Sequence, residues 1–136
     1  MTQEEKQLLL KDLCARLPYG VKILDIPANV VGDLFLVSTT DTVEYETNDD
    51  MGTQTLYNIK PYLRPMSSMT SKEWMEYCDA CLEDDMSWTW ARAGKEFKFF
   101  PITHREEFLN THHFDYRGLI PMGLALEAPE DMYKTE

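Results

Sequence analysis

Two short segments of the 136-residue chain concentrate side chains that could do chemistry. The first runs from His112 to Arg117 (HHFDYR) and brings imidazole, carboxylate, phenol and guanidinium groups close together. Such groups can serve as general acids and bases. Neighbours in sequence seldom converge in a site, however, and the same residue types also stabilise the end of a helix, so structural roles are the favoured interpretation. The weak catalytic candidates are His112, His113, Asp115 and Arg117.

The second segment is Cys78-Asp-Ala-Cys81, which has the C-x-x-C form of a redox pair or of half a zinc site. A redox pair lies at a helix N-terminus, where the helix dipole lowers a thiol pKa, whereas this pair falls two turns into an expected helix. A zinc site needs two further ligands, and the three histidines do not supply a second pair at the usual spacing. We therefore expect buried core cysteines, with no metal and no cofactor.

Other catalytic patterns are missing from the sequence. Neither Ser38 nor Ser67-Ser68 lies in a G-x-S-x-G context, and the chain has no glycine-rich phosphate loop. Nucleophilic catalysis and nucleotide binding are both unsupported, which favours a non-enzymatic protein.

The formal charge of −11 is distributed unevenly. Between Lys22 and Lys60 there is no Lys or Arg, yet this stretch holds Asp25, Asp33, Asp41, Glu44, Glu46, Asp49 and Asp50. Such a surface repels phosphate backbones, so direct binding of nucleic acid is disfavoured. The N-terminus has no signal-peptide pattern, no apolar run approaches a membrane span, and the odd count of three cysteines fits a reducing compartment. These features predict a soluble cytoplasmic protein that does not enter a membrane.

Three helices are expected, each starting at a capping box in which a threonine is followed three residues later by a glutamate. The pairs are Thr2 with Glu5, Thr70 with Glu73, and Thr103 with Glu106. They predict helices over residues 3–17, from Thr70 through Leu82, and over about 104–113. The connection over 84–94, which contains Trp88 and Trp90, is expected to be non-helical.

The second helix is the element around which the expected fold is organised. Its apolar residues recur at helical spacing and form one stripe: Trp74, Tyr77, Cys78, Cys81 and Leu82. We expect this stripe to pack against a sheet formed by the residues before it. On that basis, Trp74→Asp should cost more stability than any change on the acidic face of the helix.

Strands are expected over 21–26, 34–39, 42–47, 55–60 and 96–100. The segment 48–53 (NDDMGT) should be a loop that joins two strands into a hairpin, and Pro61 and Pro65 should end the last strand of that group. The size fits one domain over residues 1–136. The predicted fold class is α+β, with an antiparallel meander of three to five strands and about three helices packed on one face.

Three blocks of the chain, at 8–22, 60–70 and 112–133, together show a resemblance: LLLKDLCARLPYGVK, KPYLRPMSSMT and HHFDYRGLIPMGLALEAPEDMY. In this order they resemble a family of uncharacterised small proteins of Bacteroides-type gut bacteria and their prophages or phages. The resemblance implies a cytoplasmic protein encoded by a bacterium or a phage. It implies no activity and no functional residue.

Three function hypotheses follow. The leading one is a non-enzymatic interaction module, of phage origin by the resemblance, that binds a protein partner through an acidic and aromatic surface: Trp88, Trp90, Glu44, Glu46, Asp49 and Asp50. An alternative is an acidic mimic of DNA that occupies a nucleic-acid-binding protein, which requires carboxylates spaced like phosphates along one face. A third is a small enzyme or metal protein whose His112–Arg117 side chains converge in a pocket. The oligomeric state is left open.

Overall fold

The computed structural model describes residues 1–93 and 103–133, and of residues 85–93 only the helical backbone. The α-helices are α1 (Gln3–Arg16), α2 (Ser71–Ala93) and α3 (His104–Thr111). The strands are β1 (Lys22–Asp25), β2 (Val30–Val37), β3 (Thr42–Glu46), β4 (Met51–Thr55), β5 (Ile59–Leu63) and β6 (Leu126–Glu127). Short 3-10 turns lie at Leu17–Tyr19, Leu56–Asn58 and Met66–Ser68. The strand expected over 96–100 lies outside the described residues.

The strands form one mixed sheet in the order β4-β3-β2-β1-β5-β6. Strands β1 to β4 make an antiparallel meander, after which β5 returns to pair with β1 on the other side, also antiparallel. Strand β6, contributed by the C-terminal segment, pairs with β5 in parallel. The α+β class and the three helices are confirmed, but the sheet has six strands and is not wholly antiparallel, so the predicted meander describes only part of it.

The region after β3 differs from the prediction. The expected loop over 48–53 contains the start of β4, which is the hairpin partner of β3, and the expected strand over 55–60 is divided by the 3-10 turn at Leu56–Asn58. Strand β5 also continues through Pro61 to Leu63. Its pairing with β6 begins only at Tyr62, so at Pro61 this strand has a neighbour on one side alone, where a missing N–H is tolerated.

The capping boxes place the helix starts correctly. The Thr2 hydroxyl accepts the Glu5 N–H at 3.1 Å, and the Thr70 hydroxyl accepts the Glu73 N–H at 3.2 Å. In α3 the Thr103 hydroxyl accepts the Glu106 N–H at 3.2 Å. All three predicted starts are confirmed because these contacts are local and need no tertiary partner.

The core lies between the sheet and α1. Leu9 and Leu13 of α1 are fully buried and belong to one apolar cluster with the inward residues of the strands and with the segment after α3. That cluster consists of Leu9, Leu13, Val21, Ile23, Leu34, Val43, Tyr45, Leu56, Ile59, Leu63, Leu119, Leu124 and Ala125. Among the α2 residues whose side chains are described (71–84), none belongs to it.

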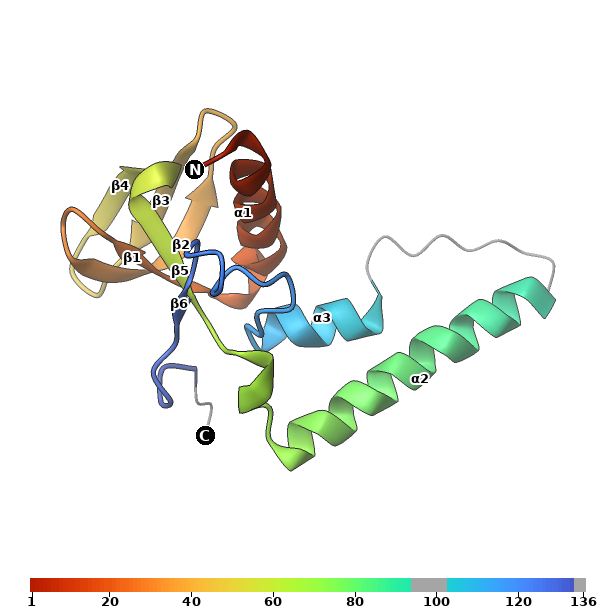
Figure 1. The fold of residues 1–136 in the computed structure, drawn as a ribbon. Coiled ribbons are helices and arrows are strands. Elements are labelled where there is room, and N and C mark those ends of the chain that lie inside the picture. The colour runs from red at the N-terminus through yellow and green to blue at the C-terminus, as the bar shows by residue number, and fades with distance from the viewer. Residues whose placement is uncertain (94–102, 134–136) are drawn as a thin grey trace.

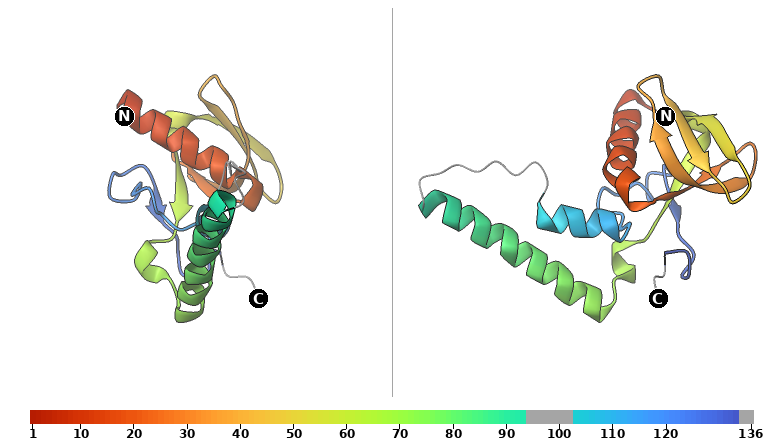
Figure 2. Two further views of the ribbon diagram at one scale, coloured as in Figure 1. Left: turned by 90° about the vertical axis from the view of Figure 1, so that its right-hand side faces the viewer. Right: turned by 180° about the vertical axis from the view of Figure 1, so that it is seen from behind.

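Helix α2 is therefore placed differently from the expectation. Figure 1 shows it running away from the sheet, and the right-hand view of Figure 2 likewise shows α3 between α2 and the sheet. The prediction that all helices pack on one face of the sheet is wrong for α2. This helix also continues to Ala93, through the segment expected to be a non-helical connection.

In the described part of the chain, none of the helices combines the length and apolarity needed to cross a membrane.

Tyr45 of β3 explains why two glycines occur in the flanking strands. Its ring covers Gly52, which is its partner on β4, and also Gly32 of β2. A Cβ added at Gly32 would lie 2.5 Å from the Tyr45 ring and 2.9 Å from the Glu46 carbonyl oxygen. The ring is held there because its hydroxyl donates to Asp25 Oδ2 at 2.6 Å. The two glycines thus make room for a buried aromatic side chain.

Gly52→Ala should lower the free energy of unfolding by about 1–3 kcal/mol, because the new methyl group overlaps the Tyr45 ring and forces it from its site. Urea unfolding of the two proteins measures the difference. Thr53→Ala, at the next and exposed position of the same strand, is the matched control and should cost less than about 1 kcal/mol. Equal effects of the two substitutions would contradict the prediction.

Candidate functional site

The four candidate catalytic residues point to four different partners. His112 is half-buried against the Phe108 ring, at a centroid distance of 4.5 Å, and its Nδ1 lies 3.6 Å from Glu73 Oε2. His113 is buried and takes a left-handed backbone conformation with φ of 60°. Its Nε2 donates to the Tyr19 carbonyl oxygen at 3.1 Å, and its ring lies 4.1 Å from that of Tyr133.

The other two candidates are engaged locally or with α1. The Asp115 carboxylate accepts the N–H groups of Leu119 and Ile120 at 2.8 and 2.9 Å, which closes a turn. Arg117 Nη1 donates to Asp12 Oδ1 at 2.7 Å. The structure therefore does not bring the four side chains together in one site.

A buried ionic cluster that the sequence analysis did not predict lies between α1 and the segment after α3. Asp12 and Arg16 are both fully buried; Arg16 Nε donates to Asp12 Oδ2 at 2.9 Å and Arg16 Nη2 to the Phe114 carbonyl oxygen at 2.5 Å. Burial and the charge of Arg16 lower the pKa of His113 to about 4, so this histidine is neutral near pH 7. The only advance signal was the i, i+4 spacing of Asp12 and Arg16.

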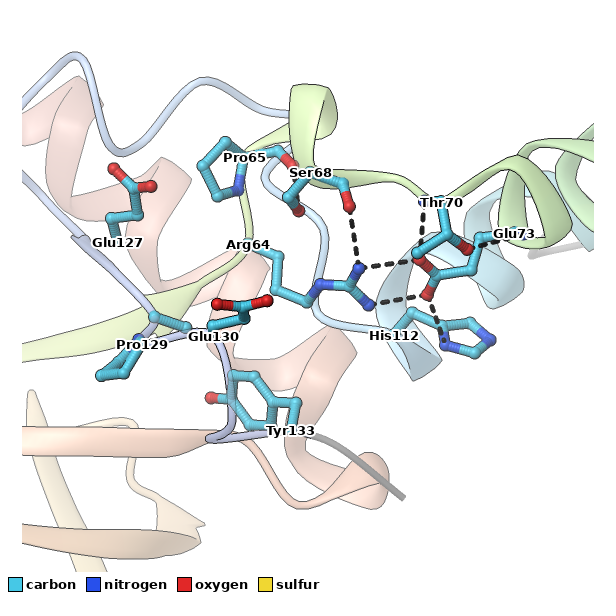
Figure 3. Close-up of a pocket in the computed structure, with 11 residues that line it drawn as sticks. Arg64, Pro65, Ser68, Thr70, Glu73, His112, Glu127, Pro129, Glu130 and Tyr133 are labelled. Carbon is cyan, nitrogen blue, oxygen red and sulfur yellow. Dashed lines mark hydrogen bonds and ion pairs between the residues drawn. The ribbon is translucent and has the colours of Figure 1, made fainter. Parts of the chain in front are cut away.

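A pocket of about 560 Å³ opens where α2 begins, and among the four candidates only His112 lines it. Figure 3 shows the Arg64 guanidinium facing the Glu73 carboxylate there, with two hydrogen bonds of 2.7 and 2.8 Å. The hydrogen bonds from Arg64 lower the pKa of Glu73 to about 2 even though burial opposes them. Arg64 and Glu73 neutralise each other, and the other described acids of the lining, Glu127 and Glu130, are exposed. The Glu73 carboxylate is therefore shared between the Arg64 guanidinium and the His112 ring, whose Nδ1 lies 3.6 Å from Glu73 Oε2.

Glu73→Gln should destabilise the protein by about 2 kcal/mol, because it removes the negative charge that faces Arg64 and leaves one oxygen, in place of two, to accept from Arg64 and from the Thr70 N–H. The effect should shrink as the pH falls from 4.5 towards 2, where Glu73 of the wild type itself becomes protonated. Chemical denaturation at pH 7 and pH 3 measures both. Glu76→Gln, an exposed neighbour on the same helix, should change stability by less than about 0.5 kcal/mol at either pH.

Polar contacts with α3 fix the rotation of α2 about its axis. Tyr77 faces Phe108 at a ring distance of 6.1 Å, and the Asp84 carboxylate accepts the N–H groups of His104 and Arg105 at 2.7 and 3.1 Å. Burial raises the pKa of Asp84, but these N–H groups and the Arg105 side chain outweigh it and hold the pKa at about 2. Asp84 thereby caps the first turn of α3, and Glu73, Tyr77 and Asp84 form the covered face of α2.

The opposite face of α2 is apolar and exposed. Trp74, Met75 and Leu82 are 56%, 68% and 58% exposed, and Cys78 between them is also exposed. We call these four residues the outward face of α2. The expectation that Trp74, Cys78 and Leu82 pack against the sheet is wrong, because α3 and Arg64 bind the Glu73 side of the helix instead. Cys78 is not a buried core cysteine, while Cys81 is half-buried.

The candidate partner-binding residues lie on two parts of the molecule. Trp88 and Trp90 belong to the last turns of α2, and their side chains lie outside the described residues. Glu44 and Glu46 share the outer side of β3, whereas Asp49 and Asp50 follow in the exposed turn. In the neighbouring strand, Asp33 lies opposite Glu46 and is paired with Lys22 at 2.7 Å. Mimicry of DNA by these carboxylates stays a prediction.

Within residues 1–84 and 103–133, whose side chains the structure describes, no three His, Cys, Asp or Glu side chains are grouped so that they could hold a metal ion. No known protein family, curated protein or solved structure matches the chain.

Proposed function

We propose that the protein is a non-enzymatic interaction module that binds a protein partner through the outward face of α2. The observation that carries this proposal is the exposure of Trp74, Met75 and Leu82 on one side of a helix that leaves the sheet. Burying one such side chain contributes roughly 1.5–3 kcal/mol, and contiguous exposed apolar side chains are typical of protein-binding surfaces. A tryptophan at the start of the row suits the role of a binding anchor.

The outward face is held in place before any partner arrives. Arg64 binds Glu73 at one end of the described part of α2, and the first turn of α3 binds Asp84 at the other. The partner therefore does not have to order this helix, which lowers the entropic cost of association. Trp88 and Trp90 continue the same helix, so the proposal keeps them as partner-binding residues beyond the described side chains.

Trp74→Glu/Leu82→Glu should abolish partner binding, because it places two charges in the centre of the contact. The matched control is Phe35→Glu/Leu36→Glu, which changes two apolar side chains of β2 that are 50% and 39% exposed and lie away from α2. Both variants should keep the circular dichroism spectrum of the wild type.

The measurement is quantitative affinity capture from cells that encode the protein, followed by titration of the captured protein against all three purified chains. The proposal expects one stoichiometric partner. Its affinity should fall at least about tenfold for Trp74→Glu/Leu82→Glu, which is a loss of more than about 1.4 kcal/mol of binding free energy. For the control variant its affinity should fall less than about twofold. A partner that binds both variants equally well would overturn the proposal, as would a wild-type chain that captures nothing above an inert column.

A further inference from the structure

The outward face of α2 has a spacing that suits one kind of partner. Its members follow one another at intervals of three and four residues, Met75 to Cys78 to Leu82, with Trp74 four residues before Cys78. This is the interval at which two helices bring side chains into one shared seam, and it covers about 12 Å of helix length between Trp74 and Leu82. An extended partner, whose side chains alternate every second residue, does not match this interval.

A row of acids borders this seam on one side. Glu76, Asp79 and Glu83 are exposed and spaced by three and four residues, so they share one side of α2, which we call the acidic edge. Asp79 is four residues after Met75 and three before Leu82, which makes the acidic edge adjacent to the outward face. The other border of the outward face is occupied by Tyr77, whose ring lies 5.8 Å from that of Trp74 and which contacts α3.

The charges argue against a second copy of this chain as the occupant. The exposed charged residues of α2 up to Glu83 are one cation, Lys72, and the three acids of the acidic edge. Pairing two such helices would bring like charges together, and each chain carries a formal charge of −11. Like charges across an interface disfavour association, whereas opposite charges fix the register and speed the encounter.

We infer that the partner segment is a basic amphipathic helix that lies lengthwise on the outward face of α2 and sets Lys or Arg residues against the acidic edge. The inference rests on the proposed function and names the chemistry of its partner. Because α3 occupies the other side of α2, the basic residues belong on one flank of the partner helix only. Their spacing should match that of Glu76, Asp79 and Glu83, with apolar residues at every third or fourth position beside them.

A displayed library of helical peptides tests this inference. Each peptide carries leucine at the seam positions, and each flanking position is drawn equally from Lys, Glu, Gln and Ser. The library is selected on the wild-type chain and depleted on Trp74→Glu/Leu82→Glu. We expect the enriched peptides to carry Lys on one flank, and we expect their affinity to fall as salt rises from 50 to about 500 mM, because the flanking pairs are exposed to solvent.

Two charge-reversal variants sharpen the selection. On Glu76→Lys/Asp79→Lys/Glu83→Lys the enrichment should change from Lys to Glu at the same flank. Glu4→Lys/Glu127→Lys reverses two exposed acids on α1 and β6 and should leave the enrichment unchanged. A retained circular dichroism spectrum confirms that each variant is folded.

The outcomes separate the inference from the proposed function. Enriched peptides without a Lys preference that still depend on Trp74 and Leu82 would overturn the basic partner and leave the interaction surface standing. If no peptide binds the wild type better than it binds Trp74→Glu/Leu82→Glu, the inference is overturned. Affinity capture of a partner with the same variant then decides the proposed function by itself. A wild-type dimer in light scattering that Trp74→Glu/Leu82→Glu dissolves would replace the basic helix with a second copy.

Discussion

Replacing Arg16 with alanine should lower the free energy of unfolding by about 3–5 kcal/mol, the largest effect expected for any single substitution in this chain. Arg16 and Asp12 are both fully buried, and the guanidinium also donates to the Phe114 carbonyl oxygen. Removing it leaves the Asp12 carboxylate in the interior with Arg117 as its remaining ionic partner. A buried charge that loses a partner costs far more than an exposed one.

One feature of the site offsets part of this loss. Within the described residues, Arg16 Nη1 finds no hydrogen-bond acceptor, so the native state carries an unsatisfied buried donor that Arg16→Ala removes. Urea unfolding at pH 7 measures the effect. Lys11→Ala, one turn away on the exposed side of α1, is the matched control and should change stability by less than about 0.5 kcal/mol. A loss below about 1 kcal/mol for Arg16→Ala would show that the cluster contributes little to the fold.

Asp12→Leu combined with Arg16→Met should recover part of that loss. Apolar side chains of similar size avoid the desolvation of two buried charges, and such replacements are often neutral or stabilising. The recovery should be incomplete because Arg117, which is largely buried, then loses its carboxylate. A double variant less stable than Arg16→Ala would mean that the ionic pair, rather than the volume it fills, holds α1 against the C-terminal segment.

Local features of the fold were predictable from the sequence, and distant contacts were not. The three helix starts depend on a threonine and a glutamate three residues apart, and all three are present in the structure. The alternation from Thr42 to Glu46 likewise identified β3 and its buried residues Val43 and Tyr45. In contrast, Gly52 reads as a turn residue until the Tyr45 ring that covers it is known. Strand β6 has two residues and left no recognisable pattern.

The candidate site was mispredicted for a related reason. Helical spacing identified the apolar face of α2, but it did not show which element covers that face. An apolar helix face usually packs against the core, and we expected the sheet to cover this one for that reason alone. The rotation of α2 depends on Glu73 finding Arg64 and on Asp84 finding the N-terminus of α3, twenty residues later in the chain. In the buried cluster, the spacing of Asp12 and Arg16 is a local signal, but Arg117 lies 105 residues from Asp12 and no local pattern links these two residues.

Acidification should destabilise the protein between pH 6.5 and about 4 through His113. Burial and the Arg16 charge lower the pKa of this histidine to about 4 from its ordinary value of 6.5. In that pH range the unfolded chain binds a proton that the folded chain does not, so stability is complete above pH 6.5 and is lost as the pH falls. At about 1.4 kcal/mol for each pH unit, the total loss from this group is about 3 kcal/mol.

His113→Asn tests the assignment, because asparagine tolerates the left-handed backbone conformation at this position but does not titrate. The variant should be less stable at pH 7, where it lacks the bond to the Tyr19 carbonyl, yet its stability should change much less between pH 6.5 and 4.5 than that of the wild type. Glu73 and Asp84, with pKa values of about 2, lose their contributions below this range and do not obscure the comparison. If urea unfolding gave His113→Asn and the wild type the same slope, the acid sensitivity would have to come from another group.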